Sequence, residues 1–174
     1  MTDLKDIKAF AFDIDGVFTN GGVLCDLKGE LYRTFDAKDG FAVRMAFMNG
    51  YPMAIITGAR SVSIIERFRT NGIGPENVFL GSRDKVADLL KFCTAHGIEP
   101  KDVLYIGDDL PDLPIFGVCG VFVCPCDAVQ EVLEAADIVS PYPGGKGCIR
   151  EILERVMKIQ GRWSFDVQQY KKDF

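Results

Sequence analysis

The sequence offers little that would suit a nucleic-acid or membrane partner. It contains one histidine, His96, and its 20 basic residues are outnumbered by 25 acidic ones, giving a net charge of −5. A phosphate backbone requires clustered Lys and Arg, so this balance argues against nucleic-acid binding. No run approaches the ~18 apolar residues that span a bilayer, and the amino end lacks the apolar core of a signal peptide. We therefore expect a cytoplasmic protein with no nucleic-acid or membrane partner.

Cysteine is not arranged for disulfides or for zinc. The six cysteines are scattered, and the close pair Cys124 and Cys126 has no second pair at zinc-finger spacing. A chain of 174 residues, of which 48% are hydrophobic, can bury a core without such cross-links. We expect reduced thiols and a single domain over residues 1–174.

Short apolar runs alternate with helical patterns along the chain, which is typical of an α/β protein. The runs at 7–12, 53–57 and 103–106 each lead into polar residues and predict buried parallel strands. Apolar residues at i, i+3, i+4 and i+7, counted from Val86 and from Ile149, predict helices that pack one face on a sheet. The predicted fold class is a doubly wound, Rossmann-like parallel sheet.

Two segments fall outside this alternation. Residues 17–35 have no helical period and hold a turn sequence, 26–29, between β-prone stretches, which predicts a projecting β-hairpin flap. Residues 161–174 form a polar C-terminal tail. A helix is expected to open at Asp39-Gly40 and to end before Pro52.

Polar side chains follow several of the predicted strands. Asp13 and Asp15 stand where the first strand meets a glycine turn, Thr57 and Asp108 end later strands, and Lys85 lies at a helix start. Ligands of open α/β sheets bind beyond the carboxyl ends of the strands, so we expect these groups to share one crevice. An Asp-rich turn can also simply cap the next element, but polar groups at several strand ends favour a common site.

These residue types point to phosphoryl transfer. Clustered carboxylates repel one another unless a divalent cation neutralises them, and an all-oxygen donor set suits Mg²⁺. We expect Asp13, Asp15 and Asp108 to hold the metal. Lys85 and the Thr57 hydroxyl would bind the phosphate oxygens that the metal leaves, and a carboxylate beside the metal can attack phosphorus.

In order and spacing, these residues resemble the four motifs of the haloacid dehalogenase superfamily. The matching segments are Asp13-Ile-Asp15-Gly16-Val17, Thr57-Gly58, Lys85 and Gly107-Asp108-Asp109-Leu-Pro-Asp112. Response regulators use similar residues, but their phosphorylated Asp lies mid-chain, so the order here argues against a receiver domain. The resemblance implies that Asp13 is the nucleophile, that Asp15 is the acid/base residue, and that Thr57 and Lys85 complete the catalytic set. The second Asp is shared by the superfamily's phosphatases and phosphomutases.

The gaps between Asp15 and Thr57 and between Lys85 and Asp108 are too short for a cap domain. Among capless members, the chain resembles the 3-deoxy-D-manno-octulosonate 8-phosphate phosphatases over nearly its full length. The resemblance implies Mg²⁺-dependent hydrolysis of that sugar acid phosphate in lipopolysaccharide synthesis. It also implies a homotetramer whose hairpins reach adjacent active sites. The shared motifs are 13–21, 38–41, 56–58, 107–112 and 144–151.

The same resemblance implies a set of substrate-binding residues. Arg44 and Arg67 suit the carboxylate of a sugar acid, because arginine grips carboxylates through paired hydrogen bonds. The alternative is that both are solvated helix charges. The implied set is Asp15, Asp36, Ala37, Lys38, Asp39, Gly40, Arg44, Gly58, Arg60, Arg67 and Lys85.

Ala59 departs from the family pattern. Many relatives carry Arg directly after Thr-Gly, and phosphatases of nine-carbon keto-sugar acid 9-phosphates (KDN or sialic acid type) place Glu there. Here Ala59 is followed by Arg60, so the nine-carbon class stays open as an alternative. A non-catalytic regulatory binding module is a second alternative, against which the intact motifs argue. The segment 144–147 is either a phosphate-binding nest or a loop before a helix.

Overall fold

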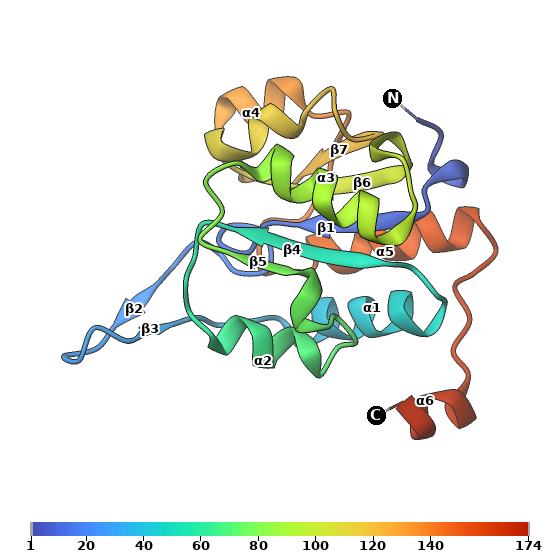
Figure 1. Cartoon of the computed structure of the whole chain (residues 1–174), viewed down its shortest axis with the longest axis horizontal. Helices are drawn as coiled ribbons and strands as arrows, with labels where there is room; N and C mark the ends of the chain where they lie inside the picture. The colour runs from blue at the N-terminus through green and yellow to red at the C-terminus, as the bar shows by residue number, and fades with distance from the viewer. Residues whose placement is uncertain (1, 174) are drawn as a thin grey trace.

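Six parallel strands form the sheet of this protein in the computed structural model, which describes residues 2–173. The strand order is β5-β4-β1-β6-β7-β8, and every pairing is parallel. The order reverses at β1, which confirms the predicted doubly wound α/β class (Figure 1). The strands are β1 Ala9–Phe12, β4 Met53–Thr57, β5 Val78–Leu80, β6 Val103–Ile106, β7 Val121–Cys124 and β8 Ile138–Val139.

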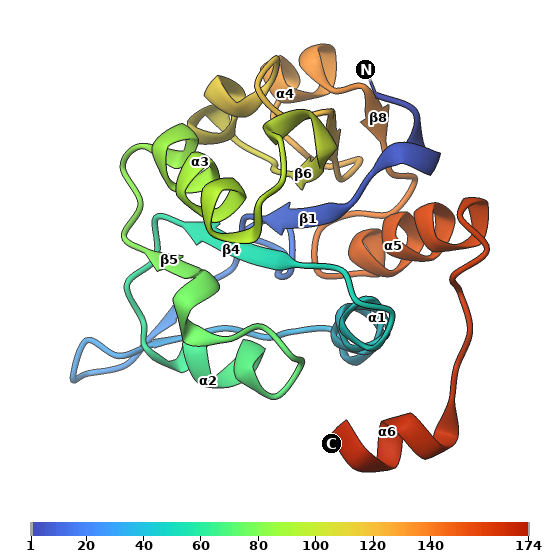
Figure 2. The same cartoon turned by 45° about the vertical axis from the view of Figure 1, so that its right-hand side comes forward.

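Helices cover both faces of this sheet. On β1, Phe10 and Phe12 pack into the core beneath α1, α2 and α5, whereas Ala9 and Ala11 pack against α3 and α4 on the other face. Figure 2 shows α1 and α5 lying together on one side of the sheet. Burial of each large apolar side chain contributes roughly 1.5–3 kcal/mol, so β1 is held firmly from both faces. The helices are α1 Ala37–Met48, α2 Ser63–Arg69, α3 Lys85–His96, α4 Gln130–Ala135, α5 Cys148–Ile159 and α6 Val167–Asp173.

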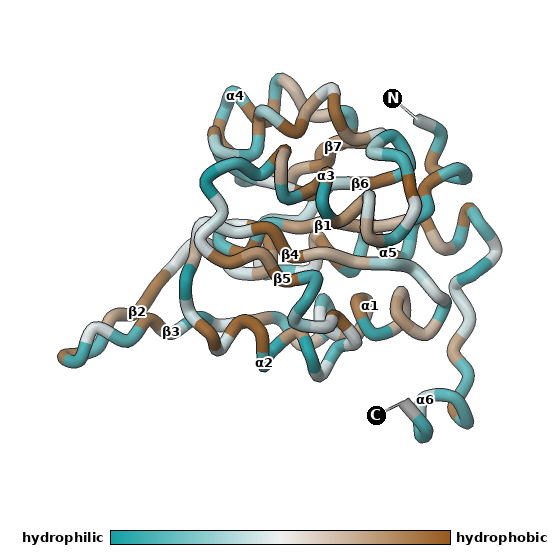
Figure 3. The backbone as a smooth tube through the Cα atoms, in the orientation of Figure 1, coloured by the Kyte–Doolittle hydropathy of each residue, from teal (hydrophilic) through white to brown (hydrophobic). Residues whose placement is uncertain are grey.

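A two-stranded antiparallel hairpin leaves the body of the protein after β1. Its strands are β2 Leu24–Cys25 and β3 Leu31–Tyr32, within the segment predicted as a hairpin. The Asp26 carboxylate accepts hydrogen bonds from two backbone N–H groups of the turn. Figure 1 shows the hairpin projecting from the body of the protein, and Figure 3 shows an apolar stretch at β2. Its exposed apolar residues are Val23, Leu24, Leu27, Leu31 and Tyr32.

The C-terminal tail folds back on its own chain. The Tyr170 ring of α6 packs at a tilted angle against the rings of Phe41 and Phe165, and its hydroxyl accepts a hydrogen bond from Arg44 Nη1 at 2.9 Å. Gln169 adds a 3.0 Å hydrogen bond to the carbonyl of Met48. The tail therefore packs along α1. Within residues 2–173, no helix has the length and apolar character needed to cross a membrane.

The glycine-rich segment 144–147 is a loop that packs against the turn after β1. A Cβ on Gly144 would lie 1.9 Å from the carbonyl oxygen of Gly16, so only glycine fits there. Gly147, with φ of 104°, precedes α5 as its N-cap residue. All six cysteines are free thiols, as the sequence predicts.

Helix α1 begins at Ala37, two residues before the predicted start. The reason is Asp36, which is the N-cap residue of the helix. Its carboxylate accepts hydrogen bonds from the backbone N–H groups of Lys38 at 2.7 Å and Asp39 at 3.1 Å. Asp39 is fully buried and accepts hydrogen bonds from the N–H groups of Gly147 at 3.2 Å and Arg150 at 2.7 Å. The Asp39 side chain therefore links α1 to the start of α5 through these two hydrogen bonds.

Replacing Asp39 by Ala tests this structural role. The change leaves two N–H groups at a buried helix start without partners, so we expect the free energy of unfolding to fall by about 2–3 kcal/mol in urea titrations. Unchanged stability combined with a raised KM would instead favour the substrate contact that the sequence resemblance implies for Asp39.

Candidate active site

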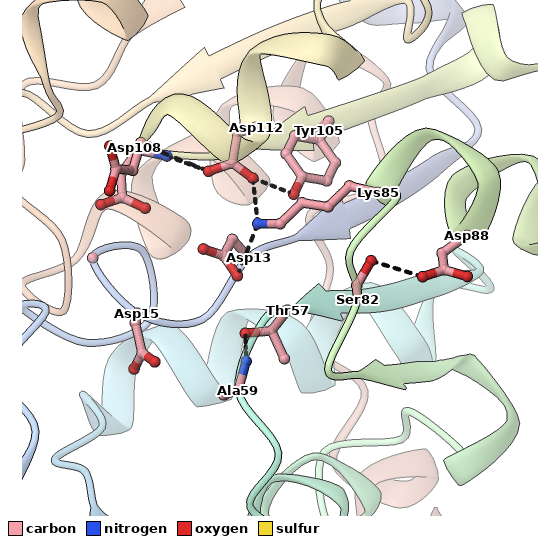
Figure 4. A network of polar contacts seen from close by, with 12 residues as sticks. Asp13, Asp15, Thr57, Ala59, Ser82, Lys85, Asp88, Tyr105, Asp108 and Asp112 are labelled. Atoms are coloured by element: carbon pink, nitrogen blue, oxygen red, sulfur yellow. Dashed lines mark hydrogen bonds and ion pairs between the residues drawn. The ribbon is translucent and has the colours of Figure 1, made fainter.

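The carboxyl ends of β1, β4 and β6 meet around a buried group of polar side chains (Figure 4). Asp13 directly follows β1, Thr57 ends β4, Lys85 opens α3, and Asp108 follows β6. Lys85 Nζ lies 3.3 Å from Asp13 Oδ1, and the Thr57 side chain is within hydrogen-bonding reach of Asp13. The structure therefore brings together four of the five residues that the sequence placed in one crevice; the fifth, Asp15, is described below.

Asp112 lies at the centre of this group. It belongs to a 3₁₀ helix, Leu110–Ile115, and its side chain is fully buried. Its Oδ1 accepts hydrogen bonds from Lys85 Nζ and from the Tyr105 hydroxyl, both at 2.6 Å. Its Oδ2 accepts from the backbone N–H groups of Asp108 at 3.0 Å and Asp109 at 3.3 Å. Asp112 therefore fixes both the lysine and the turn that carries Asp108.

Burial dominates the electrostatics of the site. It raises the pKa of Asp13 to about 6, with a further increase from the Asp112 charge and an opposing effect from Lys85. Burial, together with the charges of Asp13 and Asp112, raises the pKa of Asp108 to about 8. Burial by itself would lower the pKa of Lys85, but Asp13 and Asp112 outweigh it and the net pKa is raised. Lys85 is therefore charged at neutral pH.

The carboxylates fit a divalent cation. Oxygens of Asp13, Asp108 and Asp112 all lie within 4.8 Å of one another. Asp13 Oδ1 and Asp108 Oδ1 are buried and accept no hydrogen bond from a described residue. When all three carboxylates are ionised, the single ammonium of Lys85 leaves two negative charges to balance, and a set of hard oxygen donors suits Mg²⁺.

The carboxylate of Asp15 lies outside this group. The predicted metal set contained Asp15 and not Asp112, whereas the structure clusters Asp112 with Asp13 and Asp108. Figure 4 shows Asp15 directed away from them, and both of its oxygens accept hydrogen bonds from Arg33. At Gly16, where φ is 89°, a Cβ would lie 1.8 Å from Asp108 Oδ2. This turn therefore brings Asp108 against the backbone after β1 and leaves the Asp15 side chain elsewhere.

The predicted substrate-binding residues fall in several places. Asp36 and Asp39 accept hydrogen bonds from backbone N–H groups at helix starts, as described above. Lys38 lines a surface pocket of about 480 Å³ that runs along α5 from Gly147 to Lys158. Arg44 donates hydrogen bonds to Tyr170 and to the Thr70 carbonyl. The remaining members are Ala37 and Gly40 on α1, Gly58 directly after β4, Arg60 against Gly81, and Arg67 over the Phe35 ring.

Sequence reasoning missed two residues that the geometry brings to the site. Tyr105 is fully buried on β6, and burial together with the Asp112 charge raises its pKa well above the ordinary value, so it is a neutral donor. A tyrosine within an apolar strand was the available signal, because a buried hydroxyl needs a partner. Arg33 lay in the segment predicted as a flap, where nothing in the pattern connected it with Asp15.

A Rossmann-like sheet that presents a buried carboxylate, a lysine and an acidic metal cluster beyond its central strand defines an aspartate-based phosphatase. The chain belongs to the haloacid dehalogenase-like hydrolase family, whose sequence profile matches residues 53–152.

Relatives with an assigned activity share nearly the whole chain. The 3-deoxy-D-manno-octulosonate 8-phosphate phosphatase of Haemophilus influenzae is 34% identical over 167 residues, 95% of this chain and 92% of the relative. The crystal structure of the Moraxella catarrhalis phosphatase of that name, in complex with magnesium, phosphate and KDO, has a TM-score of 0.87 and 31% identity, covering 92% of this chain and 91% of that one. The Yersinia pestis phosphatase gives a TM-score of 0.88 at 30% identity, covering 92% and 85%.

Removing one carboxylate from the cluster should stabilise the metal-free protein. Because the pKa of Asp108 is raised to about 8, the folded protein holds a proton that the unfolded chain loses. The stability of the metal-free wild type should therefore fall as the pH rises from about 4 to about 8. We expect Asp108→Asn to weaken this dependence and to raise the melting temperature at pH 7.5 by a few degrees.

The same melting experiment tests the metal site. Mg²⁺ should raise the melting temperature of the wild type and leave that of Asp108→Asn nearly unchanged. Equal stabilisation of both proteins by Mg²⁺ would place the cation elsewhere.

Proposed function

We propose that this protein is a Mg²⁺-dependent phosphatase that hydrolyses 3-deoxy-D-manno-octulosonate 8-phosphate to the free sugar acid and phosphate. The observation that carries the proposal is the buried Asp13 carboxylate, whose Oδ1 forms an ion pair with Lys85 Nζ at 3.3 Å but accepts no hydrogen bond from a described residue. Relatives over 92–95% of the chain carry this activity in their names, and one holds magnesium, phosphate and KDO.

The reaction proceeds in two steps. An oxygen of Asp13 attacks phosphorus and forms an aspartyl-phosphate, while the Asp15 carboxyl gives its proton to the departing sugar oxygen. Asp15 then takes a proton from the water that hydrolyses the intermediate. Lys85 and the Thr57 hydroxyl stabilise the phosphoryl oxygens, and Asp112 keeps the Lys85 ammonium in place. Bound Mg²⁺, held by the cluster at Asp13 and Asp108, supplies neutralisation of the phosphate charge.

The sugar acid carboxylate is assigned to Arg44 and Arg67. Burial and the Arg44 charge lower the pKa of Arg67, which indicates that the two guanidinium groups lie near each other. Among the described residues, Arg67 makes no ion pair, and a carboxylate placed between two arginines relieves their repulsion. The other residues proposed to bind the substrate are those of segment 36–40, Gly58 and Arg60.

We also propose that the enzyme is a cytoplasmic homotetramer. Leu27 at the hairpin tip is fully exposed and Leu24 is 70% exposed. A group of exposed large apolar side chains is unusual on the surface of a monomer. Hairpins that pack together would bury these side chains and cover the active-site crevice of an adjacent subunit. In superfamily members that have a cap domain, the cap covers this crevice. The free cysteines suit a reducing compartment.

Phosphate release from a panel of sugar phosphates tests the activity. We expect kcat/KM for the eight-carbon substrate to exceed that for nine-carbon keto-sugar acid 9-phosphates by at least tenfold, and turnover to require Mg²⁺. Asp13→Asn should lower kcat by roughly 10³-fold or more, because it removes the nucleophile. Asp6→Asn, an exposed change of the same kind, is the control. Activity retained in Asp13→Asn would reject the nucleophile, and a faster nine-carbon substrate would reject the substrate assignment.

A charge at the hairpin tip tests the assembly. Leu27→Asp should convert a tetramer into smaller species, because a carboxylate in a packed apolar interface is costly. The exposed Leu90→Asp on α3 serves as the matched control. Light scattering after size exclusion gives the mass, to be compared with the 19.2 kDa protomer. A monomeric wild type would refute the assembly.

A further inference from the structure

Arg33, directly after β3, is bound to the proposed acid/base residue. Its Nε donates to Asp15 Oδ1 at 2.6 Å, and its Nη2 donates to Asp15 Oδ2 at 2.8 Å. The Arg33 side chain is only 5% exposed, whereas that of Asp15 is 32% exposed. Paired hydrogen bonds from a guanidinium fix the plane of a carboxylate as well as its position.

The surroundings leave this arginine with one main partner. The hydrogen bonds that Arg33 donates to Asp15 raise the pKa of Arg33, burial opposes this increase, and the charges of Asp15 and Asp13 add to it. Arg33 is therefore permanently charged and lies within the field of the nucleophile. Among the described residues, it has no carboxylate partner other than Asp15, and its buried Nη1 makes no hydrogen bond.

The backbone alone does not fix Asp15. The residue leads into Gly16, a left-handed glycine, and its side chain has no other hydrogen bond to a described residue. A partly exposed Asp side chain without a partner would sample several rotamers. An acid/base group acts only when it is within hydrogen-bonding reach of the proton that it moves, so every unproductive rotamer that Asp15 populates lowers the rate.

We propose that Arg33 is a positioning residue, which holds Asp15 at the orientation from which it transfers protons and so couples the base of the hairpin to catalysis. This inference rests on the proposed phosphatase activity. Arg33 itself neither gains nor loses a proton. Before the first step, one oxygen of the Asp15 carboxylate gives up its Arg33 hydrogen bond and takes up a proton from solvent. In the first step, the carboxyl gives this proton to the bridging oxygen as the P–O bond breaks, while the other oxygen keeps its Arg33 hydrogen bond. In the second, the carboxylate accepts a proton from water.

Leaving-group dependence tests the proposal. The value of kcat/KM reports the step that phosphorylates Asp13, in which a sugar alkoxide needs a proton but p-nitrophenolate does not. In Arg33→Met, we expect kcat/KM to fall about 100-fold for sugar phosphates and less than fivefold for p-nitrophenyl phosphate. Arg33→Lys keeps the charge but not the paired hydrogen bonds, so its kcat/KM for sugar phosphates should lie between the values of Arg33→Met and the wild type. Arg69→Met is the matched control, because Arg69 is exposed and, among residues 2–173, forms an ion pair only with Glu66.

Each outcome decides the question. Equal losses for both substrates, or no loss with either, would overturn the positioning role, and Arg33→Lys supplies the same comparison if Arg33→Met fails to fold. The substrate assignment is tested separately by the wild type. If the wild type is inactive on the octulosonate phosphate, but the leaving-group difference appears with another primary sugar phosphate, the proposed substrate fails and the role of Arg33 stands.

Discussion

The buried ion pair between Lys85 and Asp112 is the interaction on which the site depends. Asp112 is fully buried and Lys85 nearly so, and a buried charge is tolerated only when it is paired and hydrogen-bonded. The pair satisfies both conditions and leaves the ammonium directed at Asp13. Burial raises the pKa values of Asp13 and Asp108, and the neighbouring carboxylate charges, including that of Asp112, raise them further against the opposing effect of Lys85. The negative charges of the site therefore exceed the single positive charge beside them. A divalent cation would neutralise this excess negative charge and so allow an anionic phosphate group to approach Asp13.

The fold supports this chemistry through close backbone approaches. β1 is packed on both faces, which fixes Asp13 at the reversal point of the strand order. Gly16 lets the turn after β1 lie against Asp108, and Gly144 lets the loop before α5 lie against the same turn. Asp39 then joins that loop to α1 through two backbone hydrogen bonds. The turn that carries Asp15 is therefore supported from several elements, while the Asp15 side chain is oriented by Arg33.

Much of the site could be predicted from short sequence patterns. Asp13, Thr57, Lys85 and Asp108 were found because each follows an apolar run or opens a helix, and the edge of a parallel sheet gathers such positions. The role of Asp112 could not be assigned, because a carboxylate in a motif can face either the metal or the lysine. The partners of Arg33 and Asp39 could not be predicted, because they depend on how the hairpin base and the loop before α5 fold back. The two-residue error at the start of α1 came from overlooking the cap at Asp36.

The order of apolar and polar residues by itself determined the α/β class, the strands at 53–57 and 103–106, and the family, because strand burial and motif spacing are local properties of the chain. Only the tertiary structure decided which carboxylates meet. Asp112 joins Asp13 and Asp108, whereas the carboxylate of Asp15 turns to Arg33. The physical reason is that charge pairing acts through space over a few ångströms, and distances of that kind between residues far apart in sequence are set by the packing of the whole sheet.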